Sequence, residues 1–342
     1  LAGVKSDGAV IVEGHHVGHL EGFKFIPDDD EADAAAKAVN AVALKALSGE
    51  IERRIQQLES ASSETIELTE QGSIKWLGTT IARITKGGDI LRPDVSVSAS
   101  DLLDATAITR IHKFLSTWIG QKINLVLVPL IRIRTDTNLT GAARGLCFQL
   151  YQSLGSVSRA SALDEIRALK PADRRKLRAL GIQIGREAAF MPTLLKPDAI
   201  GLRNLIWAAW TETSPLTPLP PGRVSMPASV DTKISTYEAI GYTLIGKRAV
   251  RIDILERLAH QAWVRSKSGG FGLAPELLSL SGCSHVELAE ILNTLGYTSK
   301  GNDKVMMFHR GRKSRKKNTQ RPKQKFNSDS PFAILQTLNK HS

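Results

Sequence analysis

Alternation of apolar and polar residues predicts two β-hairpins near the start of the chain. The pattern Val10-x-Val12-x-Gly14-x-x-Val17-Gly18-x-Leu20 recurs 64 positions later (10 to 74) as Ile74-x-Trp76-x-Gly78-x-x-Ile81-Ala82-x-Ile84. In each copy the period-two pattern flanks a glycine turn, and a glycine-led turn at Gly8 or Gly72 precedes it. We therefore predict an internal duplication in which each copy begins with a hairpin.

A long amphipathic helix is predicted after each hairpin, beyond an exit segment that contains Pro27 or Pro93. The first helix covers about 31–59, and the second covers about 100–128 and starts at Ser100-Asp101. Such units cannot bury their apolar faces alone, so we expect them to pack on each other with pseudo-twofold symmetry. The apolar stripes are Ala35, Val39, Val42, Ala46, Ile51, Ile55 and Leu58 in the first helix, and Leu103, Ile108, Ile111, Leu115, Ile119, Ile123 and Val126 in the second.

The rest of the pattern predicts an α+β, mainly helical chain in five parts. They are the duplicated hairpin-plus-helix module (1–136), a helical block (137–214), a proline-rich linker (215–222), a small α/β module that resembles a winged helix (223–309) and a basic tail (310–342). In the helical block we expect helices at 140–154, 158–168, 171–180 and 194–210.

The small α/β module is predicted from the order of its elements. Strand candidates at 223–226 and 242–245 precede helices at 250–266, 274–280 and 284–295, and a last strand is expected at 304–308. Three helices with a short turn before the third, followed by a strand, is the order of a winged helix-turn-helix. The third helix carries Glu287 and Glu290, which suit a phosphate-lined groove poorly.

A basic run after this module changes the functional picture. Nine of the sixteen residues in RGRKSRKKNTQRPKQK (310–325) are Lys or Arg and none is acidic, within a formal net charge of +12. Repulsion and the lack of apolar residues predict a disordered cationic arm, which would neutralise phosphates of a nucleic acid. A solubilising tail or a contact for an acidic protein is the alternative. The candidate contacts are Arg310, Arg312, Lys313, Arg315, Lys316, Lys317, Arg321, Lys323 and Lys325.

A second cationic cluster lies on the helix expected at 171–180. Arg174, Arg175, Lys176 and Arg178 are four cations in five residues. Arg174, Arg175 and Arg178 are further candidates for phosphate contact, and a solvated helix face explains the cluster equally well. Trp207 and Trp210 lie three residues apart in an aliphatic helix, a spacing more typical of core residues than of a base-stacking platform.

Motifs for catalysis and metal binding are missing from the sequence. It contains no G-x-x-x-x-G-K-[ST] phosphate loop, no G-x-S-x-G elbow and no H-E-x-x-H. His15 and His19 would share a face only on a helix, whereas their surroundings predict a hairpin, so we expect no metal site and no cofactor in this chain. No apolar run reaches the ~18 residues of a membrane span. We expect a cytoplasmic protein, and its start at Leu1 suggests a piece of a longer chain.

Several segments resemble the C-terminal region of Suv3-like superfamily 2 (DExH) helicases of alphaproteobacteria. The resemblance follows the same order through most of 1–309, although each motif is structural. The segments are VEGHHVGHLEGFKF (12–25), LRPDVSV (91–97), GAARGL (141–146), PADRRKLRALG (171–181), LLKP (194–197), PPGRV (220–224), GY (241–242), RIDILERL (251–258) and LSLSGC (278–283).

This resemblance implies a parent enzyme whose two upstream RecA-like motor domains bind ATP and Mg²⁺ and unwind RNA or RNA–DNA duplexes. No position here matches the motor motifs, so no catalytic residue carries over. We expect an accessory region that grips RNA or a single strand for its own upstream motor domains. The alternatives are a scaffold that docks an RNA-degradation or ribosomal partner, which the acidic N-terminal module would suit, and a winged-helix DNA-binding regulator.

Overall fold

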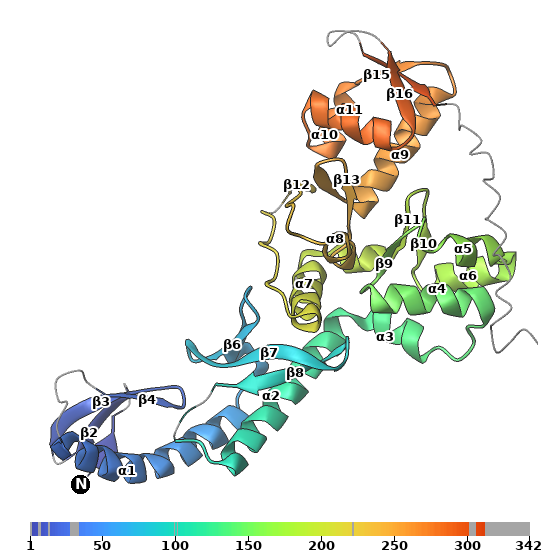
Figure 1. Cartoon of the computed structure of the whole chain (residues 1–342). Helices are drawn as coiled ribbons and strands as arrows, with labels where there is room; N and C mark the ends of the chain where they lie inside the picture. Colours follow the sequence, from blue (N-terminus) through green and yellow to red (C-terminus); the bar gives the residue numbers. More distant parts are fainter. Residues whose placement is uncertain are drawn as a thin grey trace, which may run out of the picture.

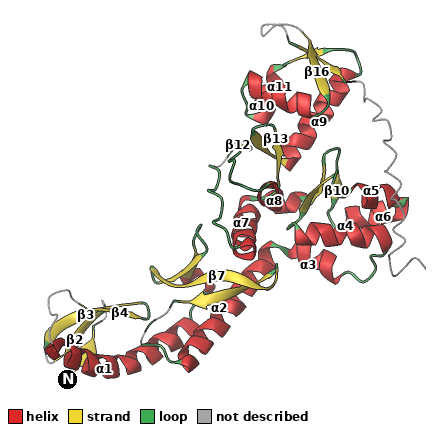
Figure 2. Ribbon diagram, viewed as in Figure 1, coloured by secondary structure: helices red, strands yellow, loops and turns green. Residues whose placement is uncertain are grey.

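The computed structural model describes residues 2–5, 8–12, 14–27, 34–98, 100, 102–220, 222–300 and 306–311. The fold is α+β and 47% helical, and the described residues form eleven α-helices and five small antiparallel sheets. Figure 1 shows a bent, elongated molecule with the first repeat at one end and the β15–β16 region at the other. Strands occur in separate patches between helices, as Figure 2 shows.

The two predicted hairpins are present, and each belongs to a four-stranded sheet with consecutive strand order. A register shift follows Val10 in the first hairpin and Ile74 in the second, which are equivalent positions of the repeat. The duplication therefore extends to the irregularities of strand pairing. The strands are β1 (Ala2–Val4), β2 (Ala9–Val12), β3 (His15–Glu21) and β4 (Lys24–Pro27) in copy 1, and β5 (Ile66–Leu68), β6 (Ser73–Trp76), β7 (Thr79–Asp89) and β8 (Arg92–Val97) in copy 2.

The glycine that begins each repeat has the same type of backbone conformation and accepts the same hydrogen bond in both copies. Gly8 and Gly72 have φ values of +92° and +77°, in the left-handed region where a side chain is strained. The carbonyl of Gly8 accepts a hydrogen bond from Leu20 N at 2.8 Å, and that of Gly72 accepts one from Ile84 N at 2.9 Å. These glycines close the hairpins in the same manner.

The hairpin of the third and fourth strands ends in a two-residue turn in both copies, but it is longer in copy 2, where its last pair is Asp89 and Arg92. Glu21 pairs with Lys24 across a two-residue turn, whereas the equivalent pair in copy 2, Thr85 and Asp94, encloses eight residues. This six-residue extension, within 86–93, joins copy 2 to the rest of the molecule.

Asp89 makes the main polar contact of the extension. Its carboxylate accepts a short hydrogen bond from the Tyr151 hydroxyl and forms an ion pair with Arg134 Nη2 at 3.2 Å. Burial, together with the hydrogen bond to Asp89, raises the pKa of Tyr151. Lys86 lies 5.6 Å from the centre of the Trp210 ring. The extension is thus a structural connector.

The contact between the copies is head-to-tail, so the expected pseudo-twofold packing is wrong. Phe23, in the short turn of copy 1, stacks on Trp76 of copy 2 with ring centres 5.9 Å apart. In a twofold pair the corresponding turn of copy 2 would face copy 1. Instead its Asp89 contacts Arg134 and Tyr151 beyond the repeats.

Each sheet is followed by a long helix, α1 (Ala34–Glu59) and α2 (Ala105–Val126). The described part of α1 buries Ile51, Ile55 and Leu58 as predicted, and its earlier stripe residues (Ala35, Val39, Val42 and Ala46) have side chains outside the described set. The predicted start of the second helix at Ser100-Asp101 is wrong. The Asp104 side chain caps α2 instead, accepting a hydrogen bond from Ala107 N at 2.7 Å.

The α2 helix ends two residues before the predicted boundary, and α3 (Val128–Thr135) continues after an 88° bend. Pro129 accounts for the break, because it has no N–H for the hydrogen bond to the Leu125 carbonyl that a continuous helix would require. Ile108, expected in the buried stripe, is 39% exposed. Among the described helices none alone has the length and apolar content to cross a membrane; only the bent α2–α3 pair has them together.

The block expected to be helical also contains a three-stranded sheet of order β10-β11-β9. The helix predicted at 158–168 is wrong in its first half, because Ser156–Ser158 pairs with Ala188–Phe190 as strands. The helices at 140–154, 171–180 and 194–210 are confirmed within a few residues. The elements are α4 (Gly141–Gln152), β9 (Ser156–Ser158), α5 (Leu163–Ala168), α6 (Pro171–Ala179), β10 (Gln183–Ile184), β11 (Ala188–Phe190) and α7 (Pro197–Thr211).

The proline-rich segment 215–222 has no helix or strand among its described residues, and it packs on the molecule. Asn204 on α7 clamps Leu216 by donating to its carbonyl at 2.7 Å and accepting from its N–H at 3.0 Å. Leu216 and Leu219 pack against a buried cluster around Tyr237. This segment is therefore anchored along its length.

The C-terminal part contains two three-stranded sheets, of order β12-β14-β13 and β15-β17-β16. The three predicted helices and the strand at 242–245 are confirmed. The last strand starts at Met307, with 304 and 305 outside the described residues. The elements are β12 (Ser225–Pro227), α8 (Ile234–Ala239), β13 (Tyr242–Ile245), β14 (Arg248–Arg251), α9 (Ile252–Ser266), β15 (Phe271–Gly272), α10 (Pro275–Ser281), α11 (His285–Thr294), β16 (Tyr297–Lys300) and β17 (Met307–Arg310).

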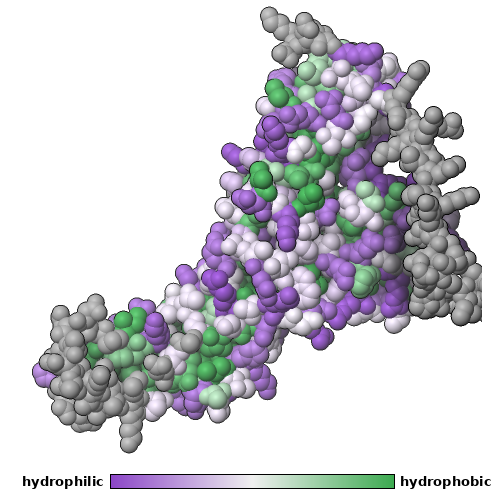
Figure 3. All heavy atoms as spheres, in the orientation of Figure 1, coloured by the Kyte–Doolittle hydropathy of each residue, from purple (hydrophilic) through white to green (hydrophobic). Residues whose placement is uncertain are grey.

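Two large clusters of buried apolar residues hold these elements. One runs without a break from Val10 in copy 1 to Ile206 in α7, and the other joins α9, α10 and α11 to their sheet. Hydrophilic residues cover most of the face in Figure 3, interrupted by apolar patches. The larger cluster makes the repeats and the central block one packed body.

Candidate nucleic-acid interface

The structure places four of the twelve predicted contact residues. Arg310 is the exposed last residue of β17, and Arg174, Arg175 and Arg178 are exposed on α6. The other eight, Arg312, Lys313, Arg315, Lys316, Lys317, Arg321, Lys323 and Lys325, lie outside the described residues. Figure 1 shows α6 in the central block and the β15–β16 sheet at the far end, so the two predicted groups occupy different parts of the molecule.

The cations of α6 are only partly free for a ligand. Arg174 donates from Nη2 to the Ile166 carbonyl at 2.8 Å, and Lys176 donates from Nζ to the Asn138 carbonyl at 3.2 Å. The side chains of Arg175 and Arg178 have no hydrogen bond or ion pair to another described residue. Both interpretations of this helix, a phosphate contact and a solvated face, remain compatible with its geometry.

A stronger cationic site surrounds Trp263 on α9. The Arg186 guanidinium lies 4.3 Å from the centre of the Trp263 ring, and Lys267 Nζ lies 3.8 Å from it. Arg310 lines the same small hollow as Trp263 and Arg186. We call these four residues the Trp263 cluster. No ion pair joins its cations to any residue whose side chain is described.

Glu256, also on α9, holds Arg186 in place through the main chain. The Glu256 carboxylate accepts hydrogen bonds from Arg186 N at 2.7 Å, Glu187 N at 2.8 Å and Ala188 N at 2.9 Å. A Cβ added at Gly185 would lie 2.2 Å from this carboxyl group, so a side chain at that position would displace the carboxylate from its three main-chain donors. One carboxylate therefore fixes the turn that carries Arg186 against the helix that carries Trp263.

Glu187 is a second acidic side chain close to the cluster, besides Glu256. Glu187 lines the same hollow, and burial, followed by the charge of Glu256, raises its pKa. Arg186 and Arg159 oppose that rise. Because burial disfavours the charged form of Glu187, this residue offsets the cations of the cluster less than a fully ionised carboxylate would.

The α11 helix, expected to enter a DNA groove if the module bound a duplex, lacks Lys and Arg. Its Glu287 forms an ion pair with Arg248 Nη1 at 2.7 Å, and its exposed residues include Val286. The Lys and Arg residues of this module lie on β14, α9, β16, β17 and the connecting loops instead. This distribution is unfavourable for readout of a DNA groove by α11.

Sequence patterns could not identify the Trp263 cluster, because Arg186, Trp263 and Arg310 come from three separate elements. No local spacing connects them; the Glu256 contact and the β15-β17-β16 sheet bring them together. The Trp207 and Trp210 expectation fits the structure, since both pack against the main core and Trp207 Nε1 donates to Thr236 Oγ1 at 3.2 Å.

Comparisons with protein-family models, curated proteins and solved structures found no match to this chain. Within the described ranges, no three His, Cys, Asp or Glu side chains gather in a way that could hold a metal ion. The Trp263 cluster is therefore the site on which a functional assignment can be built.

Proposed function

We propose that this chain binds single-stranded nucleic acid, with RNA as the ligand class, through the Trp263 cluster and the basic run that begins beside it. The observation that carries the proposal is the pair of cations, Arg186 and Lys267, held against one indole without an acidic partner among the described side chains. Cations packed against an aromatic ring lose little freedom when they bind, so they are well prepared for phosphates.

Arg310 connects the cluster to the basic run. It is the last residue of β17, and the other eight cations of the run follow within fifteen positions (311–325). A strand of nucleic acid that contacts the cluster would therefore also lie close to the Lys and Arg residues that follow Arg310.

The element order α9-β15-α10-α11-β16-β17 is that of a winged-helix module. We therefore propose a winged-helix fold for this part, on the basis of its element order and its three-stranded sheet. In this proposal the module presents α9 and β17 to the ligand, and α11 does not read bases. The absence of Lys and Arg on α11 favours a single-strand grip over the alternative of a DNA-binding regulator.

We further propose that the chain is the accessory region of an ATP-dependent helicase, a proposal that rests on the sequence resemblance. Its grip on the strand would turn the strokes of upstream motor domains into net translocation. ATP and Mg²⁺ would belong to those domains, since the sequence of this chain contains no phosphate loop. We place this activity in the cytoplasm.

The direct test replaces both cations of the cluster, in the variant Arg186→Ser/Lys267→Ser. We expect weaker binding of a single-stranded RNA oligonucleotide, and a slope of log affinity against log salt that is smaller by about 1.4, since each phosphate contact on a single strand contributes about 0.7. Fluorescence anisotropy across a series of salt concentrations measures both quantities.

The matched control removes the same charge elsewhere, in the variant Lys113→Ser/Arg132→Ser on α2 and α3, where both residues are exposed. It should bind RNA nearly as the unmodified chain does. Equal slopes for the two double variants would contradict the assignment of the interface to the Trp263 cluster.

A further inference from the structure

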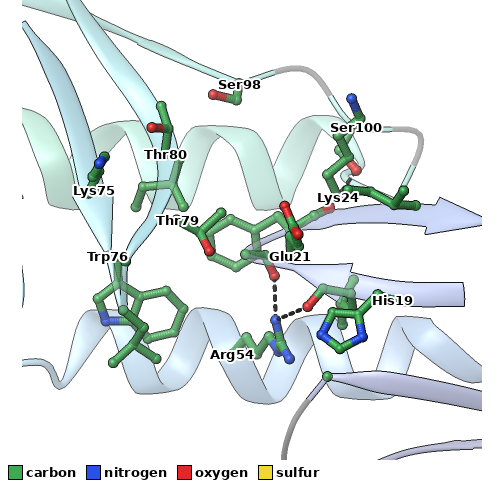
Figure 4. Close-up of a pocket in the computed structure, with 18 of the residues that line it drawn as sticks. His19, Glu21, Lys24, Arg54, Lys75, Trp76, Thr79, Thr80, Ser98 and Ser100 are labelled. Atoms are coloured by element: carbon green, nitrogen blue, oxygen red, sulfur yellow. Dashed lines mark hydrogen bonds between the residues drawn. The ribbon is translucent and has the colours of Figure 1, made fainter. Parts of the chain in front are cut away.

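A cleft of about 980 Å³ lies where the two repeats meet, remote in sequence from the Trp263 cluster. Copy 1 contributes its β3–β4 hairpin and α1, and copy 2 contributes its β6–β7 hairpin. Figure 4 shows Lys24 and His19 on the side of copy 1 and Lys75, Trp76 and Thr80 across from them. The cleft exists because the head-to-tail contact leaves the two hairpins facing one another.

Among the charged side chains that line the cleft, most are basic. Five carry or can carry positive charge and one, Glu21, carries negative charge; the five are His19, Lys24, Arg53, Arg54 and Lys75. This excess is unusual for its surroundings, because residues 1–100 contain ten Lys and Arg against sixteen Asp and Glu, a net charge of −6.

Two of these side chains bind other residues of the chain, and two are available to bind a ligand. Arg54 Nη1 donates to the carbonyls of Gly22 at 2.7 Å and Leu20 at 3.2 Å, as Figure 4 shows. Arg53 pairs with Glu50 at 2.6 Å. Lys24 and Lys75 have no ion pair with any residue whose side chain is described, which leaves a pair of free ammonium groups on opposite sides of the cleft.

An apolar residue completes the rim. Leu77, at the tip of the β6–β7 hairpin, is 72% exposed, and its φ is +49°, a conformation in which a leucine is strained. Glycine or asparagine would suit this backbone better. Ile26 of β4 is 40% exposed in the same cleft. Strain and exposure at one apolar residue are explained if its side chain contacts a partner.

The β4 strand offers a main-chain edge within the same cleft. It is the outer strand of its sheet and pairs only with β3 among the described strands. Lys24 and Ile26 are two positions apart and therefore share one face of β4. An extended segment that pairs with the free edge would run past both side chains in the cleft that Leu77 also lines.

We propose that this cleft binds an extended acidic segment of a partner protein. The segment adds a strand to the edge of β4, places carboxylates near Lys24 and Lys75, and sets an apolar side chain against Leu77 and Ile26. A peptide fits better than RNA here, since Trp76 is buried and stacked on Phe23 and so gives no open face for a base.

The test measures anisotropy of a fluorescein-labelled peptide of alternating glutamate and valine with one central leucine. A second peptide with lysine in place of every glutamate serves as the charge control, and a single-stranded RNA of similar length is the competing ligand. We expect the full chain to bind the acidic peptide at least about tenfold more tightly than the basic one.

Variants assign that binding to the cleft. Lys24→Glu/Lys75→Glu should weaken it by at least about tenfold, and Leu77→Gly, which suits the backbone while removing the side chain, by about threefold to tenfold. Lys113→Glu and Leu125→Ala make the same kinds of change at exposed positions on α2 and should leave binding unchanged.

Equal affinity for the acidic and basic peptides, or an acidic-peptide affinity that the cleft variants do not reduce, would overturn the proposal. So would tighter binding of RNA that Lys24→Glu/Lys75→Glu abolishes, which would assign the cleft to nucleic acid. These outcomes are independent of the Trp263 cluster, because Arg186 and Lys267 are unchanged in every variant.

Discussion

At the scale of single residues, the Glu256 carboxylate receives three main-chain N–H groups of the turn that carries Arg186. A glutamate on a helix surface is usually solvated, and the sequence around Glu256 reads as an ordinary amphipathic helix. Its role comes from the approach of a turn some seventy positions earlier in the chain. Tertiary contacts of this kind leave no trace in the local pattern.

The substitution Glu256→Gln tests this contact. Glutamine has one acceptor oxygen and presents an amide N–H₂ group to a donor, so we expect a loss of about 1 to 3 kcal/mol in the free energy of unfolding. Affinity for RNA should fall as well, because Arg186 is then held less firmly near Trp263. Urea unfolding and anisotropy measure the two effects.

Glu276→Gln is the matched control for that variant. Glu276 is an exposed carboxylate on α10, paired with Arg265 at 3.3 Å. Its replacement should lower the free energy of unfolding by less than about 1 kcal/mol. Equal losses for the two variants would mean that the main-chain contacts of Glu256 contribute nothing particular.

Arg203 is a second residue whose environment the sequence does not reveal. It is fully buried and has no carboxylate partner among the residues that the structure describes; its guanidinium donates to the Leu194 carbonyl at 2.9 Å and to Ser156 Oγ at 3.0 Å. Burial lowers its pKa to about 9. Arg203 lies in the mainly apolar helix α7. The sequence pattern alone would predict that an arginine there is exposed to solvent.

At the scale of elements, strict alternation around glycine turns was enough to predict both hairpins, because the strands are half-buried and pair locally. The three-residue strand β9 was missed, since Ser156–Ser158 is too short to show a period and pairs with a strand thirty positions away. The second long helix was overextended at both ends. Its cap is Asp104, and Pro129 directs the chain into α3.

The extension in copy 2 makes a prediction for Asp89→Asn. The change removes the ion pair with Arg134 and weakens the hydrogen bond from Tyr151, at a side chain that is 26% exposed. We expect the free energy of unfolding to fall by about 1 to 2 kcal/mol. Thermal or urea unfolding provides the measurement.

Glu212→Gln gives the comparison within the same junction. Glu212 pairs with Lys86 at 3.8 Å and is 72% exposed, so its loss should change stability by less than about 0.5 kcal/mol. If Asp89→Asn lowered the free energy of unfolding as little as Glu212→Gln, the extension would be held by its apolar contacts alone.

At the scale of the whole molecule, charge is distributed unevenly along the chain. Residues 1–100 sum to −6, 101–309 to +9 and 310–325 to +9. A single strand of nucleic acid is therefore drawn to the C-terminal part and repelled from the repeats, unless a local feature reverses the field. The sequence alone predicted this polarity, because net charge requires no knowledge of contacts.

Truncation after Gly311 tests the contribution of the basic run and keeps Arg310 and β17 intact. If even four of the eight removed cations contact phosphates, the salt slope for single-stranded RNA should fall by roughly 3. The midpoint of thermal unfolding should hardly move, because β17 and its sheet are retained. An unchanged slope would favour the docking alternative, with residual RNA contact at Arg174, Arg175 and Arg178.

The head-to-tail contact of the repeats has a consequence for how the chain could have grown. A contact between unlike faces has a direction and does not close on itself, so a row of such units can gain or lose members only at its open end. Copy 2 carries the extension with Asp89 that joins the body, whereas copy 1 touches the body only through copy 2 in the contacts described. Copy 1 could therefore be absent without loss of the contacts that hold copy 2 to the body, whereas the cleft requires both copies.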